Sequence, residues 1–574
     1  MSEPKTYNKT KELVSLIYCG LLLMGSPLYI VWVAEDLGGF FSRVIYLLTA
    51  MSLYALPMCF LKKRHFFWLM IPMLGLSLAD LIHVVMYKQT STIMWLCSFL
   101  IQEGNEGSEL ATIFTPAGVC VAILWGVYLT LNYRYVLKRP FFGMKMRNVV
   151  ALVSGIWLVL ALGVTVLESY TSWFGAFRTV KKVCPINFVY NYGRFRHIAS
   201  DVHDCWDAAE TFRFGAASEA RDDEVVVLII GETSRWRNWQ INGYQRETNP
   251  CLMQRKDQLC TFDSCYSIAN LTTISVPMML SRATPLTTDV FFREPTVVDA
   301  FHEAGYATSW IADQSFRSPL LLHISGRCDD IYYQEHDLQP ARDHDLLPSV
   351  AEHIRKTGKQ LLVVHSRGCH FRYSTRHTPE YSHFHPDLND VDWKSVRKYV
   401  DPSGFSVEPD AETSAVANVV RQIFTNSYDN ALRYTECFID SVIGMLESSG
   451  RPAVVLYVAD HGENLLDDNH HRVLHGQQST SVYEYHVPMF AWASDSYMER
   501  YPDVVPQLRA HKLSHVSTMN VFHTLLDLGH VEMPDKDPSL SLCSPLLVPD
   551  TVAWIIDSDL RLGSISTEEK PVGK

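Results

Sequence analysis

Residues 225–234 read VVVLIIGETS, and this stretch decides the fold of the chain around it. Six consecutive valine, leucine and isoleucine residues without alternation are typical of a strand buried on both faces, as in a parallel sheet covered by helices. Gly231 ends the strand, and Glu232 emerges at its carboxyl end, the edge where open α/β sheets bind ligands. Glu232 is therefore a metal ligand or a base, unless it only caps the helix that follows.

A second strand of the same kind ends in side chains that suit a metal. Residues 453–459 read AVVLYVA, and Asp-His-Gly-Glu follows at 460–463. A neighbouring carboxylate and imidazole are an oxygen and a nitrogen ligand, a combination that suits Zn²⁺. The two strand ends supply three ligands, Glu232, Asp460 and His461, and leave a position open for a catalytic group.

The segment between these strands contains a candidate nucleophile. Residues 271–277 read LTTISVP and begin an apolar, helix-like run after Asn270. A threonine there lies near a helix N-terminus, where the dipole and the N–H groups favour an anion. Its hydroxyl is a poor nucleophile at neutral pH unless a metal lowers its pKa. A threonine that merely caps the helix explains the same pattern.

Histidines gather after two of the predicted strands. A single histidine is usually structural, but groups of them beside acidic ligands favour metal or phosphate binding. The two groups are His365, His370, His377, His383 and His385, and His470, His471 and His475.

From residue 224 onward, apolar strands alternate with helices, which predicts a doubly wound α/β sheet. The strands are expected at 225–230, 306–312, 360–365, 453–459 and 487–493. The helices are expected at 296–304, 346–356, 413–449 and 514–528.

The first part of the chain has the pattern of an all-α transmembrane domain of five helices. Apolar runs near the ~20 residues that cross a bilayer lie at 13–34, 43–61, 66–87, 111–131 and 149–167. Basic residues cluster after the second and fourth runs, whereas the loops after the first and third are acidic or neutral. The positive-inside rule therefore places the N-terminus in the cytoplasm and everything after the fifth run outside.

Three parts are thus expected along the chain. They are a membrane anchor at 1–167, a connector with interfacial helices at 168–223, and a periplasmic catalytic domain at 224–574. The net charge of −12 disfavours a nucleic-acid-binding protein, since such proteins are usually basic. Among the 13 cysteines, Cys251 and Cys260 could close a short loop in an oxidising compartment.

Two longer segments carry a family resemblance. Gly-Glu-Thr-Ser-Arg at 231–235, followed by NGYQRETNP at 242–250, resembles the signature of the membrane-anchored phosphoethanolamine transferases of the alkaline phosphatase/sulfatase superfamily. The five-span anchor matches as well, so the resemblance covers nearly the whole chain. The later motifs agree in order and lie at 272–277, 364–370, 426–430, 460–463, 474–476 and 486–490.

The resemblance implies a zinc site with a bound nucleophile. Glu232, Asp460 and His461 would bind one Zn²⁺, and Thr272 would complete the set as the metal-activated nucleophile. In the family the nucleophile is the threonine three residues before Ser-Val-Pro, which selects Thr272 over Thr273.

The resemblance also implies substrate contacts. His370 and His475 match histidines that hold the substrate phosphate or a second zinc. Gln314 matches an amide that contacts phosphoethanolamine.

The implied activity is transfer of phosphoethanolamine from phosphatidylethanolamine to lipopolysaccharide, on lipid A or core, or to a periplasmic glycan. The reaction would pass through a covalent phosphothreonine in a monomer of the bacterial inner membrane. A phosphoglycerol transferase of the lipoteichoic acid synthase type, using phosphatidylglycerol, would share the metal site and the anchor. A sulfatase would need a Cys-x-Pro-x-Arg motif, which the sequence lacks. A scaffold protein that had lost catalysis would have no reason to keep all four residues of the zinc site.

Overall fold

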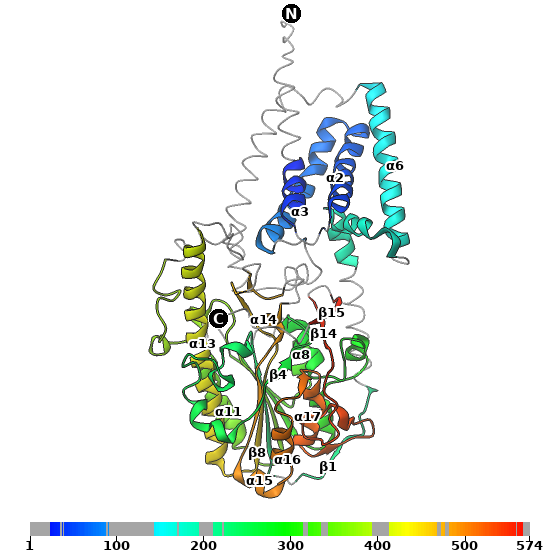
Figure 1. The fold of residues 1–574 in the computed structure, drawn as a ribbon. Coiled ribbons are helices and arrows are strands. Elements are labelled where there is room, and N and C mark those ends of the chain that lie inside the picture. Colours follow the sequence, from blue (N-terminus) through cyan, green and yellow to red (C-terminus); the bar gives the residue numbers. More distant parts are fainter. Residues whose placement is uncertain are drawn as a thin grey trace, which may run out of the picture. The chain divides into compact units, whose positions relative to one another are not determined.

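The computed structural model divides into two compact units, Met1–His197 and Ile198–Lys574, which are described separately (Figure 1). The boundary falls inside the expected connector at 168–223, and the three-part division of the chain stays a prediction. The structure describes residues 23–34, 37, 39–87, 90, 143–168, 172–193, 211–220, 223–313, 319–334, 342–392, 413–467, 472–476, 481–557 and 560–565.

The first unit is helical. Two of its described helices, over Phe40–Phe60 and Met144–Thr165, are long and apolar enough to cross a membrane, and shorter apolar helices cover Leu23–Val33 and Trp68–Leu81. Many apolar side chains of the second long helix are exposed, Leu152 and Val159 among them, as expected of a surface that faces lipid. The elements are α2 (Phe40–Phe60), α3 (Lys63–Tyr87), α6 (Met144–Glu168) and the 3₁₀ helix η2 (Ser172–Lys182).

Three of the five expected spans, at 43–61, 66–87 and 149–167, coincide with α2, α3 and α6. The span expected at 13–34 is described only from residue 23, and the one at 111–131 lies outside the described residues. The count of five spans therefore stays a prediction.

The second unit is built on a seven-stranded mixed sheet with the strand order β3-β11-β8-β2-β7-β5-β6. The strands from β8 to β6 run parallel. At the other edge β11 pairs antiparallel with β8, and β3 pairs antiparallel with β11. All five expected strands are present in this sheet. The bounds are β2 (Val225–Gly231), β3 (Cys260–Phe262), β5 (Ala307–Ala312), β6 (Asp330–Tyr333), β7 (Gln360–His365), β8 (Ala453–Ala459) and β11 (Met489–Ala493).

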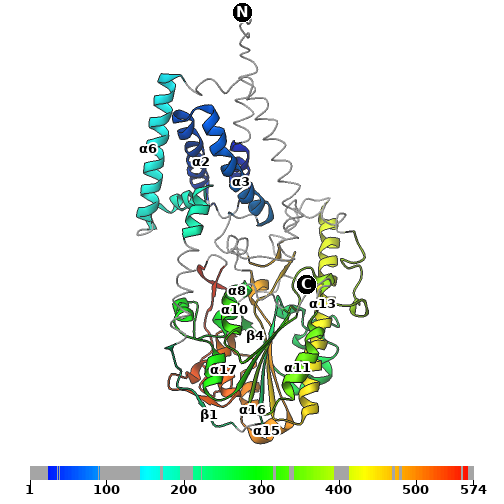
Figure 2. The same ribbon diagram turned by 180° about the vertical axis from the view of Figure 1, so that it is seen from behind.

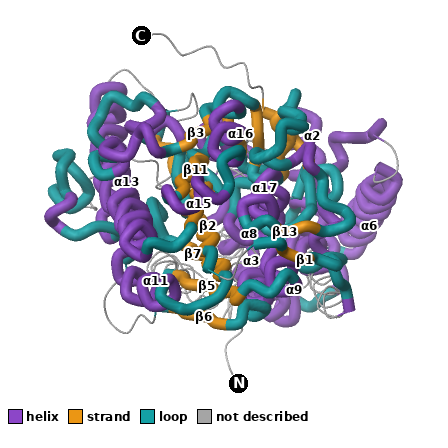
Figure 3. Tube along the Cα trace, turned by 90° about the horizontal axis from the view of Figure 1, so that it is seen from below, coloured by secondary structure: helices purple, strands orange, loops and turns teal. Residues whose placement is uncertain are grey.

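Strand β2 is buried on both faces, as its sequence predicts. Val226, Leu228 and Ile230 pack into one hydrophobic core, and the alternate residues of the strand pack into a second core on the other face. Helices α11 and α13 cover one face of the sheet, and α8, α9 and α17 cover the other (Figures 2 and 3). The absence of sequence alternation is thus explained by two apolar layers.

The helices of this unit lie near their expected positions, except that the last helix begins later than expected. Residues 515–517, expected to begin the last helix, form a strand that pairs in parallel with Ser264–Tyr266. The helix begins later because the side chain of Asn520 accepts the N–H of Ser517 at 2.9 Å. The bounds are α8 (Thr272–Met279), α9 (Val297–Glu303), α10 (Pro319–Ser325), α11 (Leu347–Ile354), α13 (Thr413–Ser449), α14 (Val482–Tyr485), α15 (Asp495–Arg500), α16 (Val504–Ala510) and α17 (Asn520–Leu528).

Among the residues that the structure describes, this unit also contains four short two-stranded sheets. They are β1 (Ala217–Ser218) with β13 (Val531–Glu532), β4 (Ser264–Tyr266) with β12 (His515–Ser517), β9 (Asn464–Leu465) with β10 (Val473–Leu474), and β14 (Ala553–Ile556) with β15 (Leu562–Ile565).

A disulfide joins Cys251 to Cys437, across 186 residues of sequence and a Cα–Cα distance of 5.6 Å. The expected loop between Cys251 and Cys260 is therefore wrong, and Cys260 is a free cysteine. The reason is the fold. Cys260 begins β3 and is held at the sheet edge by its pairing with β11, whereas Cys251 lies against α13.

We expect Cys437→Ser to lower the free energy of unfolding by about 2–5 kcal/mol, because the disulfide restricts a very long loop in the unfolded chain. The measurement is denaturant unfolding of the full chain in detergent without reductant. Cys328→Ser, which removes a free cysteine, is the matched control and should change little. The prediction fails if reductant leaves the unfolding midpoint of the unmodified protein unchanged.

Glu436 lies beside this disulfide and accepts the backbone N–H groups of Cys251 and Leu252 at 3.1 and 2.9 Å. Burial raises the pKa of Glu436 to about 8 from 4.5. The folded state then holds a proton that the unfolded state releases between pH 4.5 and 8, so this group makes the protein less stable as the pH rises through that window.

Glu436→Gln removes this titration. We expect the difference in thermal midpoint, variant minus unmodified protein, to increase steadily from pH 4.5 to pH 8, because only the unmodified protein loses stability from this group over that range. Differential scanning fluorimetry across that range checks it. A difference between the two proteins that does not vary with pH would contradict the assignment.

Candidate metal centre

Two carboxylates and one imidazole meet at the carboxyl edge of the sheet. Strands β2 and β8 are neighbours in parallel register, Gly231 opposite Ala459, so Glu232 and Asp460 leave the sheet side by side. Nε2 of His461 lies 3.4 Å from Oε1 of Glu232 and 3.5 Å from Oδ2 of Asp460. All three side chains are buried, and one ligand atom from each lies within 4.8 Å of the others. The structure therefore brings together the three expected ligands.

Thr272 completes this cluster. It is the first residue of α8, and its hydroxyl donates to Oε2 of Glu232 at 3.0 Å and lies 3.2 Å from Nε2 of His461. Helix α8 is held at the strand end because the hydroxyl of Ser275 donates to the backbone carbonyl of Asp460 at 2.6 Å. The hydroxyl of Thr272 is only partly buried, so a substrate can approach it.

The cluster has the electrostatics of a cation site. Burial raises the pKa of Asp460 to about 8, and the charge of Glu232 adds to the shift. Burial favours the neutral form of His461, but the nearby charge of Asp460 and the hydrogen bond to Glu232 outweigh it and raise its pKa to about 10. Although burial favours the neutral form of Glu232, the hydrogen bond to His461 and the charge of His461 outweigh burial and hold the pKa of Glu232 well below its usual range. A buried carboxylate that stays ionised beside a second acid and an imidazole favours a cation at this position.

One atom of the cluster fits a metal directly. Oδ1 of Asp460 accepts the N–H groups of Thr233 and His461 at 3.1 and 2.7 Å. Oδ2 is buried and has no hydrogen-bond partner within the part of the chain that the structure describes. A buried carboxylate oxygen without such a partner, facing an imidazole and a second carboxylate, is a suitable metal ligand. The oxygen and nitrogen donor set fits Zn²⁺.

The backbone around the site is specialised. Thr233 has a φ of 56°, in the left-handed region, and its hydroxyl donates to Oε1 of Glu232 at 2.6 Å, which fixes that carboxylate. Gly462 follows the ligands, and a Cβ at this position would lie 2.2 Å from the carbonyl oxygen of Tyr483. Only glycine allows the two segments to pass so closely.

His370 and His475 lie beside the first cluster. Together with Glu232 they offer ligand atoms within 4.8 Å of one another. The ring of His475 is 4.0 Å from that of His461 and 6.0 Å from that of His370. The structure therefore brings both expected histidines to the site. Gln314, the third expected substrate contact, lies outside the described residues.

A buried acid that the sequence reasoning missed positions one of these histidines. Oε2 of Glu463 lies 2.7 Å from Nδ1 of His475, and its other oxygen accepts the hydroxyl of Tyr373 at 2.8 Å. Burial raises the pKa of Glu463 to about 8. The Asp-His-Gly-Glu motif contained this residue, but only the structure reveals its partners.

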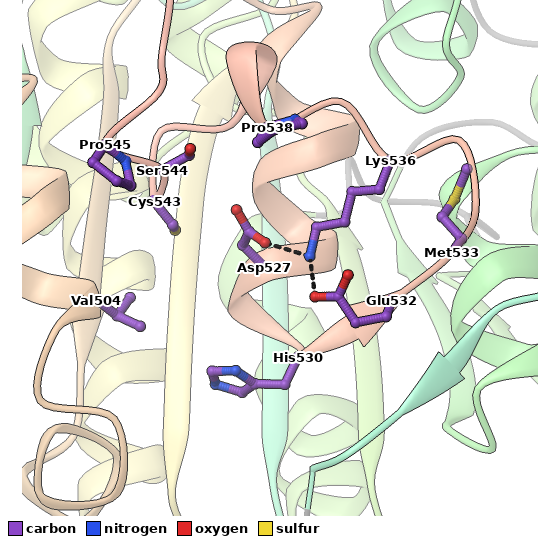
Figure 4. A pocket seen from close by; sticks show the side chains of 10 residues that line it. All are labelled: Val504, Asp527, His530, Glu532, Met533, Lys536, Pro538, Cys543, Ser544 and Pro545. Carbon is purple, nitrogen blue, oxygen red and sulfur yellow. Dashed lines mark hydrogen bonds and ion pairs between the residues drawn. The ribbon is translucent and has the colours of Figure 1, made fainter.

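A separate cavity of about 500 Å³ lies beside the end of α17 and contains none of the expected site residues (Figure 4). Its ammonium group, from Lys536, is held by Asp527 at 2.5 Å and Glu532 at 2.7 Å. The lining of this cavity is thus separate from the metal centre.

Comparisons with known proteins agree with this geometry. The family model Sulfatase matches residues 224–531. The chain therefore belongs to the sulfatase family, whose α/β domain contains the strand ends described above.

Within that family, the chain is similar to named phosphoethanolamine transferases, which confirms the resemblance seen in the sequence. It is 28% identical to the Kdo(2)-lipid A phosphoethanolamine 7''-transferase of Escherichia coli (strain K12) over 52% of this chain and 50% of that protein. The matched part thus spans about half the length of that relative. The phosphoethanolamine transferase EptC of the same strain is 24% identical over 87% of this chain and 85% of its own.

Two solved structures share the fold. The lipooligosaccharide phosphoethanolamine transferase A of Neisseria meningitidis, an integral membrane protein, superposes with a TM-score of 0.67 at 21% identity, covering 94% of this chain and 99% of its own. The periplasmic domain of EptC from Escherichia coli, in complex with Zn, superposes with a TM-score of 0.53 at 23% identity, covering 62% of this chain and 96% of its own. Both the two-unit architecture and the α/β domain thus have precedents.

We expect Asp460→Asn to weaken metal binding by more than about ten-fold, because it removes a charged ligand from a buried site. The measurement is the metal content of the purified full chain, by inductively coupled plasma mass spectrometry, after dialysis against a graded series of chelator concentrations. Asp299→Asn, which replaces a buried acid in the capping box of α9, is the control. Equal metal loss in the two variants would argue against this site.

Proposed function

We propose that the chain is a zinc-dependent transferase that moves phosphoethanolamine from phosphatidylethanolamine to lipopolysaccharide or another periplasmic glycan. The observation that carries this proposal is the position of the Thr272 hydroxyl, 3.0 Å from Glu232 and 3.2 Å from His461 at a buried anionic cluster. The names of the relatives support the transferred group, and the name of one of them points to lipid A as the acceptor.

Glu232, Asp460, His461 and Thr272 would hold the zinc ion. When bound, zinc lowers the pKa of the threonine hydroxyl and stabilises negative charge on the phosphoryl oxygens. Oε2 of Glu232 accepts the hydroxyl hydrogen bond, so it is placed to receive the proton as Thr272 attacks. Because Glu232 and Asp460 are buried, a proton taken up there is shielded from exchange with water.

In the first step the Thr272 oxygen bonds to the donor phosphorus, and the bond from phosphorus to the diacylglycerol oxygen breaks. The leaving oxygen takes up a proton and departs as diacylglycerol. In the second step an acceptor oxygen bonds to the same phosphorus, the bond to Thr272 breaks, and the threonine recovers its proton. His370 and His475 would bind the phosphoryl oxygens in both steps. Since Glu463 engages Nδ1 of His475, contacts to substrate fall to Nε2.

The cellular setting belongs to the same proposal. The disulfide between Cys251 and Cys437 supports an oxidising compartment for the catalytic unit, as a periplasmic location requires. Helices α2 and α6 support an anchor in the inner membrane. The proposed anchor has five spans and a cytoplasmic N-terminus, and the protein acts as a monomer. In the catalytic unit, Gln314 is proposed to contact phosphoethanolamine.

The test uses the full chain in detergent with head-group-labelled phosphatidylethanolamine. We expect diacylglycerol release and a phosphoethanolamine adduct on Thr272, found by peptide mass spectrometry. Thr272→Ala should lower turnover by more than about a thousand-fold and abolish the adduct, because the Thr272 hydroxyl contacts both Glu232 and His461 and is only partly buried, whereas the Thr233 hydroxyl beside Glu232 is fully buried. Thr273→Ala, one residue along the same helix, is the matched control and should keep both.

Two results would overturn the proposal. Turnover that persists in Thr272→Ala would exclude the covalent mechanism. An adduct formed from phosphatidylglycerol, with none from phosphatidylethanolamine, would assign the chain to the phosphoglycerol transferases.

A further inference from the structure

The β14–β15 hairpin presents an apolar face to solvent. Its two strands pair in antiparallel register from Ala553 opposite Ile565 to Ile556 opposite Leu562. The inner face packs into a small core with Tyr266 and α14. On the outer side, Trp554 of β14 and Leu562 of β15 have exposed fractions of 42% and 49%, and the exposed Ser564 lies opposite Trp554. Val552 before β14 and Leu560 in the turn flank them, with exposed fractions of 37% and 36%.

This hairpin is bonded directly to the segment that leads to the nucleophile. The N–H of Ile556 donates to the carbonyl of Ile268 at 2.8 Å, and Ile556 forms a parallel bridge with Ala269. Only Asn270 and Leu271 separate that bridge from Thr272. Figure 1 accordingly draws β14 and β15 beside α8. The apolar outer face is therefore fixed close to the reactive hydroxyl by backbone hydrogen bonds.

The side chains of the outer face are those that favour a membrane interface. Tryptophan is enriched at the boundary between head groups and acyl chains, where its ring sits in apolar surroundings and its N–H reaches water. Branched apolar neighbours add to the gain on leaving water. Four such side chains gathered on one short hairpin form a patch of the kind that marks a binding surface.

We propose that the outer face of the β14–β15 hairpin inserts into the lipid bilayer and holds the membrane surface at the level of Thr272. The occupant is the bilayer, because the same chain carries helices long and apolar enough to anchor it in one. Delivery of a lipid donor to Thr272 rests on the proposed function, whereas contact between the hairpin and lipid does not.

The first experiment detects the contact itself. The full chain, with Trp554→p-benzoylphenylalanine, is reconstituted into phosphatidylcholine nanodiscs, which lack the proposed donor, and irradiated. We expect lipid adducts on the peptide that contains residue 554. The control places the same photoreactive residue at Glu499, an exposed position on α15, at the far end of the unit from the hairpin (Figure 1).

Adducts at 554 and none at 499 support the proposal. Equal lipid yields at the two positions would overturn it. So would cross-links from 554 to protein in place of lipid, since they would show that a second copy or another part of the chain covers this face.

The second experiment measures the consequence for turnover. Leu562→Asp should lower kcat/KM for donor presented in phosphatidylcholine vesicles by about ten-fold, because a charge prevents insertion. Turnover of a water-soluble phosphoethanolamine ester should stay unchanged. Leu513→Asp, at an apolar position that is 76% exposed, is the matched control and should affect neither.

Equal losses on both substrates would show a folding defect or a direct role at the site and would overturn the membrane role. If the p-benzoylphenylalanine variant forms lipid adducts at 554 but the unmodified protein transfers nothing from either substrate, the proposed function fails while the membrane contact stands.

Discussion

The burial of Glu232, Asp460 and His461 in mutual contact is the constraint on which the second unit depends. Two carboxylates taken out of water repel each other, and their desolvation is costly unless a cation or shared protons compensate. This cost is visible in the raised pKa values of Asp460, about 8, and of His461, about 10, because both groups keep a proton at neutral pH. A metal ion would meet the same need with its positive charge, and under the proposed function it would also lower the pKa of the Thr272 hydroxyl.

Much of this arrangement was predictable because it is local to two strands. A short, uninterrupted run of β-branched and leucine residues such as 225–230 is typical of a strand covered on both faces. If it and 453–459 are parallel strands, the polar residues directly after them share one edge of the sheet. The strand positions and the meeting of Glu232 with Asp460 and His461 follow from that reasoning. The position of Thr272 followed only from the family motif.

The remaining features depend on contacts between distant parts of the chain, which no local pattern records. Cys251 pairs with Cys437 because α13 lies against its segment, and nothing near Cys251 in sequence indicates that helix. Glu463 was visible within its motif, but its bond to His475 depends on how the chain returns to the site. Residues 515–517 look helical in sequence and form a strand because Ser264–Tyr266 offers a partner edge.

The hairpin at the end of the chain links chemistry to the place where the substrate is found. A phosphate in a lipid head group lies at a nearly fixed depth in the membrane, so a soluble domain must hold its nucleophile at that depth. A flexible tether alone sets no such height. A rigid contact does, and the hydrogen bond from Ile556 to Ile268 transmits the position of the hairpin to the segment before Thr272. The apolar outer face would then determine how deeply this edge of the domain enters the membrane. Because the backbone joins the hairpin to the segment before Thr272, the same contact would set the depth of the reacting hydroxyl.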